Sequence, residues 1–183
     1  VVGSYVAVRF NGVIQTFFGP TGERVWRQAL PQGDNEVDDL AVFGNDLFAS
    51  TKCSGNRLCI ARVNAAPSVA PGVSRLGLNF SSSCLLAFGN PGQIVVLPNG
   101  DVVANTACAI VCFNGATGEQ RWSVDVPATQ VASCSDLRHR LGMVTAICGS
   151  TPFVINALTG ELKRINGALT ASESGEVMIT GAE

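Results

Sequence analysis

The chain has 183 residues, of which 46% are hydrophobic and 14% are charged, and its formal net charge is −2. This composition indicates a globular protein, because a disordered chain combines low hydrophobicity with high net charge. No apolar run approaches the roughly 20 residues of a membrane-spanning helix, so we expect no membrane span. The slightly acidic balance, without a Lys/Arg cluster, also argues against nucleic acid as a partner.

The chain contains an internal repeat built around a Thr-Gly-Glu triplet. Three copies are intact, and a degenerate fourth has Pro67 in place of Thr. These segments are residues 17–23, 63–69, 113–119 and 155–161. Their equivalent positions lie 46, 50 and 42 residues apart, a period at which each repeat forms one small sheet rather than a helix pair. The spacing therefore predicts the blades of a β-propeller.

Each repeat is expected to hold four antiparallel strands. Apolar stretches before and after the triplet form a hairpin, in which Gly22, Gly118 and Gly160 supply the positive φ of a two-residue turn. The Thr hydroxyl is expected to bond the turn backbone. A further strand before each hairpin is predicted at residues 1–5, 46–50, 101–105, 143–146 and 177–180, with an innermost strand at 39–43 and 93–97. The predicted fold class is all-β, made of antiparallel four-stranded propeller blades.

This frame predicts a single propeller, or a segment of one, with about four repeats and a partial fifth. The repeats are expected at residues 1–35, 36–80, 81–128, 129–167 and, for the partial one, 168–183. Propellers usually hold 4 to 8 blades, so we expect the chain to be part of a larger ring. An isolated arc would leave edge strands and blade faces uncovered, which favours association.

Two of the repeats carry a longer signature. Residues 20–26 read Pro-Thr-Gly-Glu-Arg-Val-Trp, and residues 116–122 read Ala-Thr-Gly-Glu-Gln-Arg-Trp. This pattern resembles the repeat of the quinoprotein-type, or PQQ-like, β-propeller family. The resemblance implies that Trp26 and Trp122 dock between neighbouring blades, with Gly22, Gly118 and Gly160 as further structural anchors. An indole repeated in a fixed frame is also more typical of blade packing than of a cofactor stack.

The same resemblance raises the question of catalysis. The quinone-dependent dehydrogenases of this family carry a disulfide between adjacent cysteines over the cofactor and a calcium held by Glu, Asn and Asp. This sequence has no Cys-Cys pair, so we expect no catalytic residue and no cofactor in the chain.

Two functions remain open. The first is a non-catalytic scaffold or protein-interaction module, as a subunit or segment of an extracellular or envelope assembly, which binds a protein partner or another copy through blade edges and loops. The alternative is a fragment of a quinone-dependent (PQQ-type) oxidoreductase whose active site lies on other blades.

Other polar residues give weaker signals. His139, the only histidine, lies near a predicted turn, and we interpret it as solvated rather than as part of a catalytic triad. The acidic residues Asp34, Glu36, Asp38 and Asp39 lack the spacing and central Gly of a calcium loop, and we interpret them as a solvated loop between blades. Without a Cys-x-x-Cys motif, a zinc site is not expected.

Four of the seven cysteines form two pairs, each symmetric about a predicted turn: Cys53 with Cys59, and Cys134 with Cys148. Residues opposite one another on antiparallel strands are close enough to bridge, so both pairs are candidate disulfides.

The other three cysteines, Cys84, Cys108 and Cys112, leave an odd number, so at least one thiol is free or pairs outside the chain. The symmetric pairs favour a secreted, periplasmic or other oxidising compartment. The alternative is a cytosolic protein in which these cysteines are small buried apolar residues.

Overall fold

The computed structural model describes most of the chain, and the described residues form seventeen strands, β1 to β17. The described ranges are 5–10, 13–30, 37–53, 57–64, 76–85, 92–106, 108–126, 134–149, 151–163, 168–171 and 177–180. Among these residues, no helix is long and apolar enough to cross a membrane.

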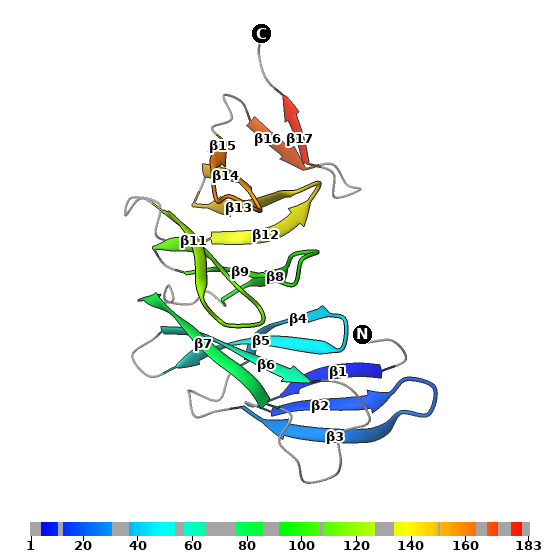
Figure 1. Cartoon of the computed structure of the whole chain (residues 1–183). Coiled ribbons are helices and arrows are strands. Elements are labelled where there is room, and N and C mark those ends of the chain that lie inside the picture. Colours follow the sequence, from blue (N-terminus) through cyan, green and yellow to red (C-terminus); the bar gives the residue numbers. More distant parts are fainter. Residues whose placement is uncertain are drawn as a thin grey trace.

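Five antiparallel sheets follow one another along the chain, and within each sheet the strands are ordered as in the sequence (Figure 1). The first sheet is β1 (Tyr5–Phe10), β2 (Val13–Phe18) and β3 (Glu23–Ala29). The second is β4 (Val37–Phe43), β5 (Asp46–Cys53), β6 (Arg57–Asn64) and β7 (Leu76–Leu85). The third is β8 (Ile94–Val96), β9 (Val102–Asn105), β10 (Ala109–Phe113) and β11 (Gln120–Asp125). The fourth is β12 (Cys134–Arg140), β13 (Met143–Cys148), β14 (Thr151–Asn156) and β15 (Leu162–Lys163), and the fifth is β16 (Ala168–Ala171) and β17 (Val177–Thr180).

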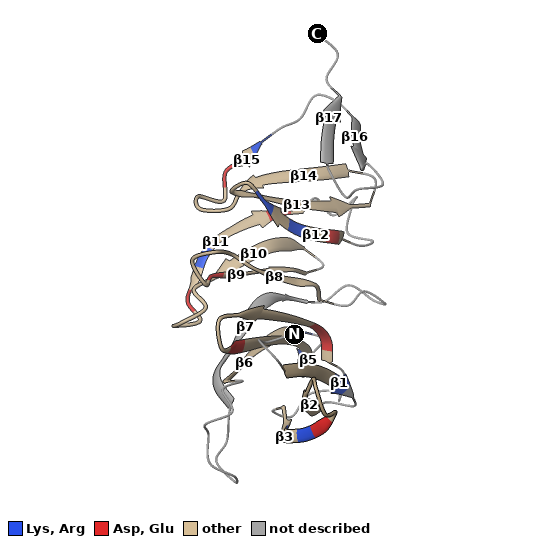
Figure 2. Ribbon diagram, turned by 90° about the vertical axis from the view of Figure 1, so that its right-hand side faces the viewer, with Lys and Arg blue, Asp and Glu red and all other residues tan. Residues whose placement is uncertain are grey.

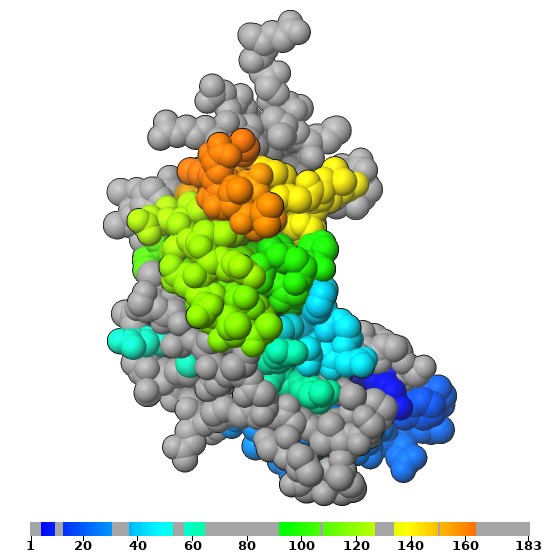
Figure 3. Space-filling model, viewed as in Figure 1, coloured from blue at the N-terminus to red at the C-terminus, as the bar shows by residue number. Residues whose placement is uncertain are grey.

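The first strands of successive sheets lie next to one another. β4 contacts β8, and β8 contacts β12, so the sheets stack through their inner edges as propeller blades do. In Figure 3 the third and fourth sheets form a continuous surface in chain order. The predicted all-β fold of antiparallel, four-stranded propeller blades is confirmed.

Most predicted strand bounds lie within three residues of the observed ones, and two predicted boundaries differ by more. The strand expected at residues 1–5 is β1, which starts at Tyr5 because Tyr5 pairs with Phe18 and the ladder continues to Phe10 opposite Val13. Residues 1–4 lie outside the described residues. The outer strand β7 crosses the boundary expected after residue 80, because its pairing with β6 extends to Leu85.

Each hydrophobic cluster lies between two sheets rather than within one. The cluster between the first and second sheets contains Ile14, Trp26, Val37, Leu47, Ala49 and Val63. The next contains Phe48, Leu58, Ile60, Ile94, Val102, Ala104, Ala109, Val111 and Phe113, and the last includes Leu97, Val103, Ile110, Cys112, Trp122, Val144, Phe153 and Ile155. Alternate residues of β9 and β10 enter different clusters, so every residue of these strands is buried. That double burial explains why these two strands are apolar apart from Asn105.

Trp122 joins the third sheet to the fourth. Its indole Nε1 donates a 3.1 Å hydrogen bond to the carbonyl of Ala157 in the β14–β15 turn. In the same turn, a Cβ built on Gly160 would lie 2.7 Å from Cγ of Trp122. The indole therefore rests directly on the backbone of the next sheet. Trp26, in turn, lies in the cluster that the first sheet shares with the second.

Polar side chains connect the inner strands across the sheet boundaries. Asp39 Oδ2 accepts the backbone N–H of Ile94 at 3.1 Å, and Gln93 Oε1 accepts that of Leu137 at 3.2 Å. Asp38 Oδ2 accepts the N–H of Gly92 at 3.4 Å. The predicted solvated acidic loop is thus wrong for Asp38 and Asp39, which lie in β4 and satisfy donors of the next sheet.

The rest of that acidic segment, Asp34 and Glu36, lies outside the described residues. Within the described part of the chain, no three His, Cys, Asp or Glu residues gather as metal ligands.

A disulfide joins Cys134 to Cys148 on the paired strands β12 and β13. Continued from the turn without interruption, the β12–β13 register would put Cys134 opposite Gly149. A one-residue bulge next to Asp136, whose φ is 54°, shifts the register so that Cys134 faces Cys148. The bulge is therefore what allows these two cysteines to bond.

The β5–β6 hairpin has a different centre from the predicted one. Cys53 pairs with Arg57, so the hairpin centres on residue 55 rather than on Asn56, and Thr51 is the residue opposite Cys59. Cys59 and Cys108 are both disulfide-bonded. The predicted Cys53–Cys59 bond lies outside the described residues, since the side chain of Cys53 is not among them, nor is that of Cys84.

We predict that Gly160→Ala destabilises the protein more than Gly22→Ala does. Both glycines have positive φ, 73° and 69°, so each substitution costs about 1–2 kcal/mol of backbone strain. A Cβ at position 22 meets nothing within 4 Å, whereas one at position 160 collides with Trp122, which adds about 1–3 kcal/mol of overpacking. Urea unfolding followed by tryptophan fluorescence measures both. Equal shifts of the two midpoints would contradict the docking of Trp122 on this turn.

Candidate functional site

The Thr-Gly-Glu turns lie at one rim of the stack, next to the turns that join the first and second strands of each sheet. In the β10–β11 turn, Asn114 Oδ1 accepts the N–H groups of Ala116 and Thr117 at 2.8 and 3.1 Å. The hydroxyl of Thr117 accepts the N–H of Glu119 at 3.3 Å, and Gly118, with φ of 77°, donates to the carbonyl of Asn114. We call this edge the turn rim.

The predicted two-residue turn is wrong, although the predicted positive φ and Thr hydrogen bond are both present. Asn114 donates its N–H to the carbonyl of Glu119 at 2.8 Å, so four residues lie inside the turn. The β14–β15 turn repeats this arrangement with Asn156 and Thr159. Because these polar side chains fold back onto the backbone, Leu158 between them projects outward and is 76% exposed.

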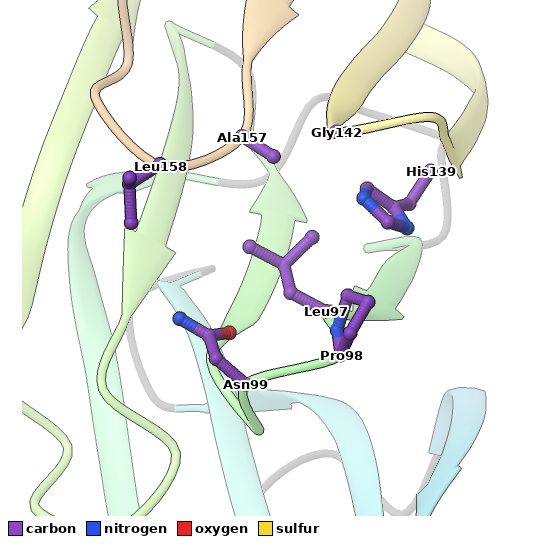
Figure 4. Close-up of a pocket in the computed structure, with 7 residues that line it drawn as sticks. All are labelled: Leu97, Pro98, Asn99, His139, Gly142, Ala157 and Leu158. Carbon is purple, nitrogen blue, oxygen red and sulfur yellow. The ribbon is translucent and has the colours of Figure 1, made fainter.

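An apolar pocket of about 240 Å³ lies on the turn rim between the third and fourth sheets. Its lining residues are Leu97, Pro98, Asn99, His139, Gly142, Ala157 and Leu158 (Figure 4). Leu97 and Ala157 are buried and form its floor, while Leu158 and His139 lie on opposite sides of it in Figure 4. His139, interpreted from the sequence as a solvated residue, is half-buried and lines this pocket.

A second pocket, of about 300 Å³, occupies the equivalent position between the second and third sheets. It is lined by Phe43, Asp46, Phe48, Arg62, Asn99, Gly100, Asp101, Asn114, Gly115, Ala116 and Arg121. Arg62 Nη2 contacts Asp46 Oδ2 at 2.6 Å, and Arg121 Nε contacts Asp101 Oδ2 at 3.0 Å. Asn99 lines both pockets, so the β8–β9 turn separates an apolar pocket from a polar one.

The turn next to the apolar pocket contains a strained leucine. Leu141 and Gly142 form the β12–β13 turn with φ of 50° and 76°. Gly suits this conformation, whereas a leucine there costs about 1–2 kcal/mol. The Leu141 side chain is 90% exposed, so no burial of its own offsets that cost. Positive φ at both residues is the geometry of a type I′ hairpin turn, which favours Asn or Gly at the position that Leu141 occupies.

Charge is sparse over the described residues. Figure 2 shows both signs on β3 and on β12, and no described element carries a long run of one sign. The ionic side chains of the polar pocket are Arg62 and Arg121 with their two aspartates, and the Thr-Gly-Glu turns add the exposed Glu119 and Glu161 to the rim.

Cys112 is the free cysteine among those described, and it is buried. Burial, and to a lesser extent the carboxylate of Asp101, raise the pKa of its thiol to about 12. Because the thiolate is the nucleophile, this cysteine is suited to packing between the third and fourth sheets and not to covalent chemistry.

The predicted site residues are thus divided between the core and the rim. The predicted anchors Trp122 and Gly160 touch each other, and Trp26 packs between sheets, while Gly118 and Gly22 occupy turns on the rim. The residues of the polar pocket were not identified from the sequence, because they are contributed by two different repeats. The exposed leucines were not identified either, although Leu158 occupies the position of Ala116 and Pro20 in the repeat frame.

No protein-family model matches this chain, and no curated protein sequence does. Solved structures of similar fold exist. One is a chain of the crystal structure of the mitotic checkpoint complex, with a TM-score of 0.64 and 11% identity over 90% of this chain and 47% of that one. BamB from Moraxella catarrhalis has a TM-score of 0.56 and 15% identity over 99% of this chain and 62% of its own. A protein of unknown function from Bacteroides caccae has a TM-score of 0.59 and 13% identity over 88% and 56%.

These similarities concern the fold alone, because the identities are low. The chain covers between 47% and 62% of the lengths of these three proteins.

We predict that Cys112 resists alkylation in the folded protein. With a pKa of about 12, only about one thiol in ten thousand is ionised at pH 8, and burial blocks access to it. Iodoacetamide is expected to modify Cys112 completely in denaturant and hardly at all in native buffer, as measured by peptide mass spectrometry. Similar rates in the two conditions would show that this thiol is accessible.

Proposed function

We propose that this chain is a non-catalytic scaffold that binds a protein partner through its turn rim. The observation that carries the proposal is the pair of adjacent pockets beside two highly exposed leucines, Leu141 and Leu158. Exposed apolar side chains around a pocket are typical of protein-binding surfaces. The inner faces of the blades, in contrast, are occupied by the clusters that hold the sheets together.

The sizes of the pockets support a protein partner over a large cofactor. At about 240 and 300 Å³ they lie at or below the lower end of the roughly 300–1,000 Å³ range of drug-sized ligand sites. Each suits one or two side chains of a partner. Similarity to a chain of a multiprotein complex, the mitotic checkpoint complex, is in keeping with this function.

The proposal extends to family and compartment. Membership of the PQQ-like repeat family is supported by the contact of Trp122 with the next sheet at Gly160. A secreted, periplasmic or other oxidising location, within an extracellular or envelope assembly, is supported by the Cys134–Cys148 disulfide, since disulfides persist mainly in oxidising compartments.

The partner surface is testable by photo-crosslinking in the cells that produce the protein. The full protein, as its gene encodes it, carries a photo-crosslinking amino acid at position 158. We expect a covalent adduct with another protein. The matched control is position 162, where Leu162 on β15 is also exposed but lies outside both pockets. Adducts of twice the mass of the chain would identify the partner as a second copy. No adduct from position 158, or equal adducts from both positions, would contradict a partner surface at the rim.

The strained leucine provides a second variant in the same experiment. Leu141→Asn is expected to reduce the adduct from position 158 while raising stability by about 1 kcal/mol, because Asn tolerates positive φ. A loss of stability with an unchanged adduct would show that Leu141 serves folding instead of binding.

The compartment is testable by trapping thiols in intact cells before lysis. We predict that the peptides containing Cys134 and Cys148 are recovered disulfide-linked, and that Cys112 is recovered as a free thiol. Recovery of Cys134 and Cys148 in the alkylated, reduced form would contradict an oxidising location.

A further inference from the structure

We propose that the two pockets form one groove for an extended segment of the partner protein, which places an apolar side chain in the apolar pocket and a carboxylate side chain in the polar pocket. The inference rests on the proposed function and specifies the chemistry of the partner. Asn99, which lines both pockets, marks the point where the segment crosses the β8–β9 turn.

The apolar pocket selects a single aliphatic or aromatic side chain. Its floor is apolar, because Leu97 and Ala157 are buried there, and the backbone groups of Ala157 are occupied. Its carbonyl accepts the indole N–H of Trp122 at 3.1 Å, and its N–H donates to Gly142 at 2.9 Å. A polar group of the partner protein would therefore lose its hydration at that floor and find few hydrogen-bonding groups to replace it. An apolar group would instead bury its own surface and that of Leu158.

The polar pocket favours a negative group over a positive one, even though it holds two arginines and two aspartates. Asp101 is almost fully buried, with 8% of its side chain exposed, and it already forms an ion pair with Arg121 and accepts from Asn99 Nδ2 at 2.8 Å. Arg121, in contrast, is 49% exposed. The accessible charge in this pocket is therefore positive.

Arg121 also has hydrogen-bonding capacity left. It contacts Asp101 through Nε, and neither terminal nitrogen of its guanidinium bonds another residue of the described part of the chain. Two adjacent N–H donors of this kind match the two oxygens of a carboxylate. The ring of Phe43, 39% exposed and 3.0 Å from where a Cβ on Gly100 would lie, forms an apolar wall beside them.

The test uses short synthetic peptides in which one Leu and one Glu are separated by Gly-Ser spacers of increasing length, added to the protein as its gene encodes it. His139 is the only histidine, so its imidazole signal in NMR reports occupation of the apolar pocket directly. We expect one spacer length to bind and to shift that signal. Peptides with Lys for Glu, or Ser for Leu, are expected to bind at least about tenfold more weakly, a loss of about 1.4 kcal/mol.

Protein variants locate the two contacts. Leu158→Ser and Arg121→Gln are each expected to weaken binding of the Leu/Glu peptide about tenfold, and Leu162→Ser to leave it unchanged. Arg121→Lys keeps the positive charge opposite Asp101 but lacks the paired donors, so it separates loss of carboxylate binding from loss of folding. It is expected to fold as the wild type does and to bind more weakly.

Three results would overturn the inference: binding that is independent of the Glu, binding that both pocket variants retain, and absence of peptide binding at every spacer length. If the peptide test fails but position 158 still crosslinks to a protein in cells, the proposed function is retained and only the chemistry assigned to the partner is rejected.

Discussion

Contact between successive sheets is the constraint on which the rest of this structure depends. The first four sheets have three or four strands each, and each hydrophobic cluster lies between two of these sheets. No sheet therefore buries its apolar residues alone, which is the general property of repeat proteins that stack one unit on the next. Trp122 is a single-residue example of this contact between sheets. Its indole touches the backbone of Gly160 and leaves no room for a side chain there.

The same turns that receive these contacts also shape the candidate site. A four-residue turn closed by Asn and Thr presents a backbone carbonyl to the preceding sheet, at Ala157 in one case and at Gly115 in the other. Its remaining residues face outward on the rim. One turn therefore contributes both to the contact between sheets and to the candidate binding surface. The hydrogen bonds that hold its residue Ala157 in place also fix the position of Leu158.

Sequence reasoning predicted the parts of this structure that local chemistry determines. A Thr-Gly-Glu triplet needs only its own residues to turn the chain, so the repeat frame, the positive φ at Gly160 and the blade architecture were all predictable. The bulge beside Asp136 was not, because one extra residue leaves no periodic signal, and the hairpin centre between Cys53 and Arg57 was misplaced by one residue for a similar reason. Arg62 and Arg121 lie 59 positions apart, and only the stacking of two sheets brings them into one pocket.

Divergence between repeats explains why the two pockets differ. In the third repeat, Trp122 donates to the carbonyl of Ala157 and fills the space beneath the turn, so the pocket above it is apolar. In the second repeat the equivalent carbonyl, that of Gly115, instead faces Arg62 Nη1 at 3.5 Å, and the same guanidinium pairs with Asp46.

A guanidinium needs water or charge around it, whereas an indole packs among apolar groups. The contact of Arg62, on the third strand of its sheet, with the Gly115 carbonyl therefore makes this pocket polar, although the turn it contacts is equivalent to the one above Trp122. A propeller built from identical repeats would present identical pockets along its rim. Here two equivalent turns are contacted by different side chains from different strands, Trp122 of β11 and Arg62 of β6, which gives the neighbouring pockets opposite preferences. In the groove proposed above, a partner has to satisfy both pockets in a fixed order along the chain, which confers direction as well as specificity.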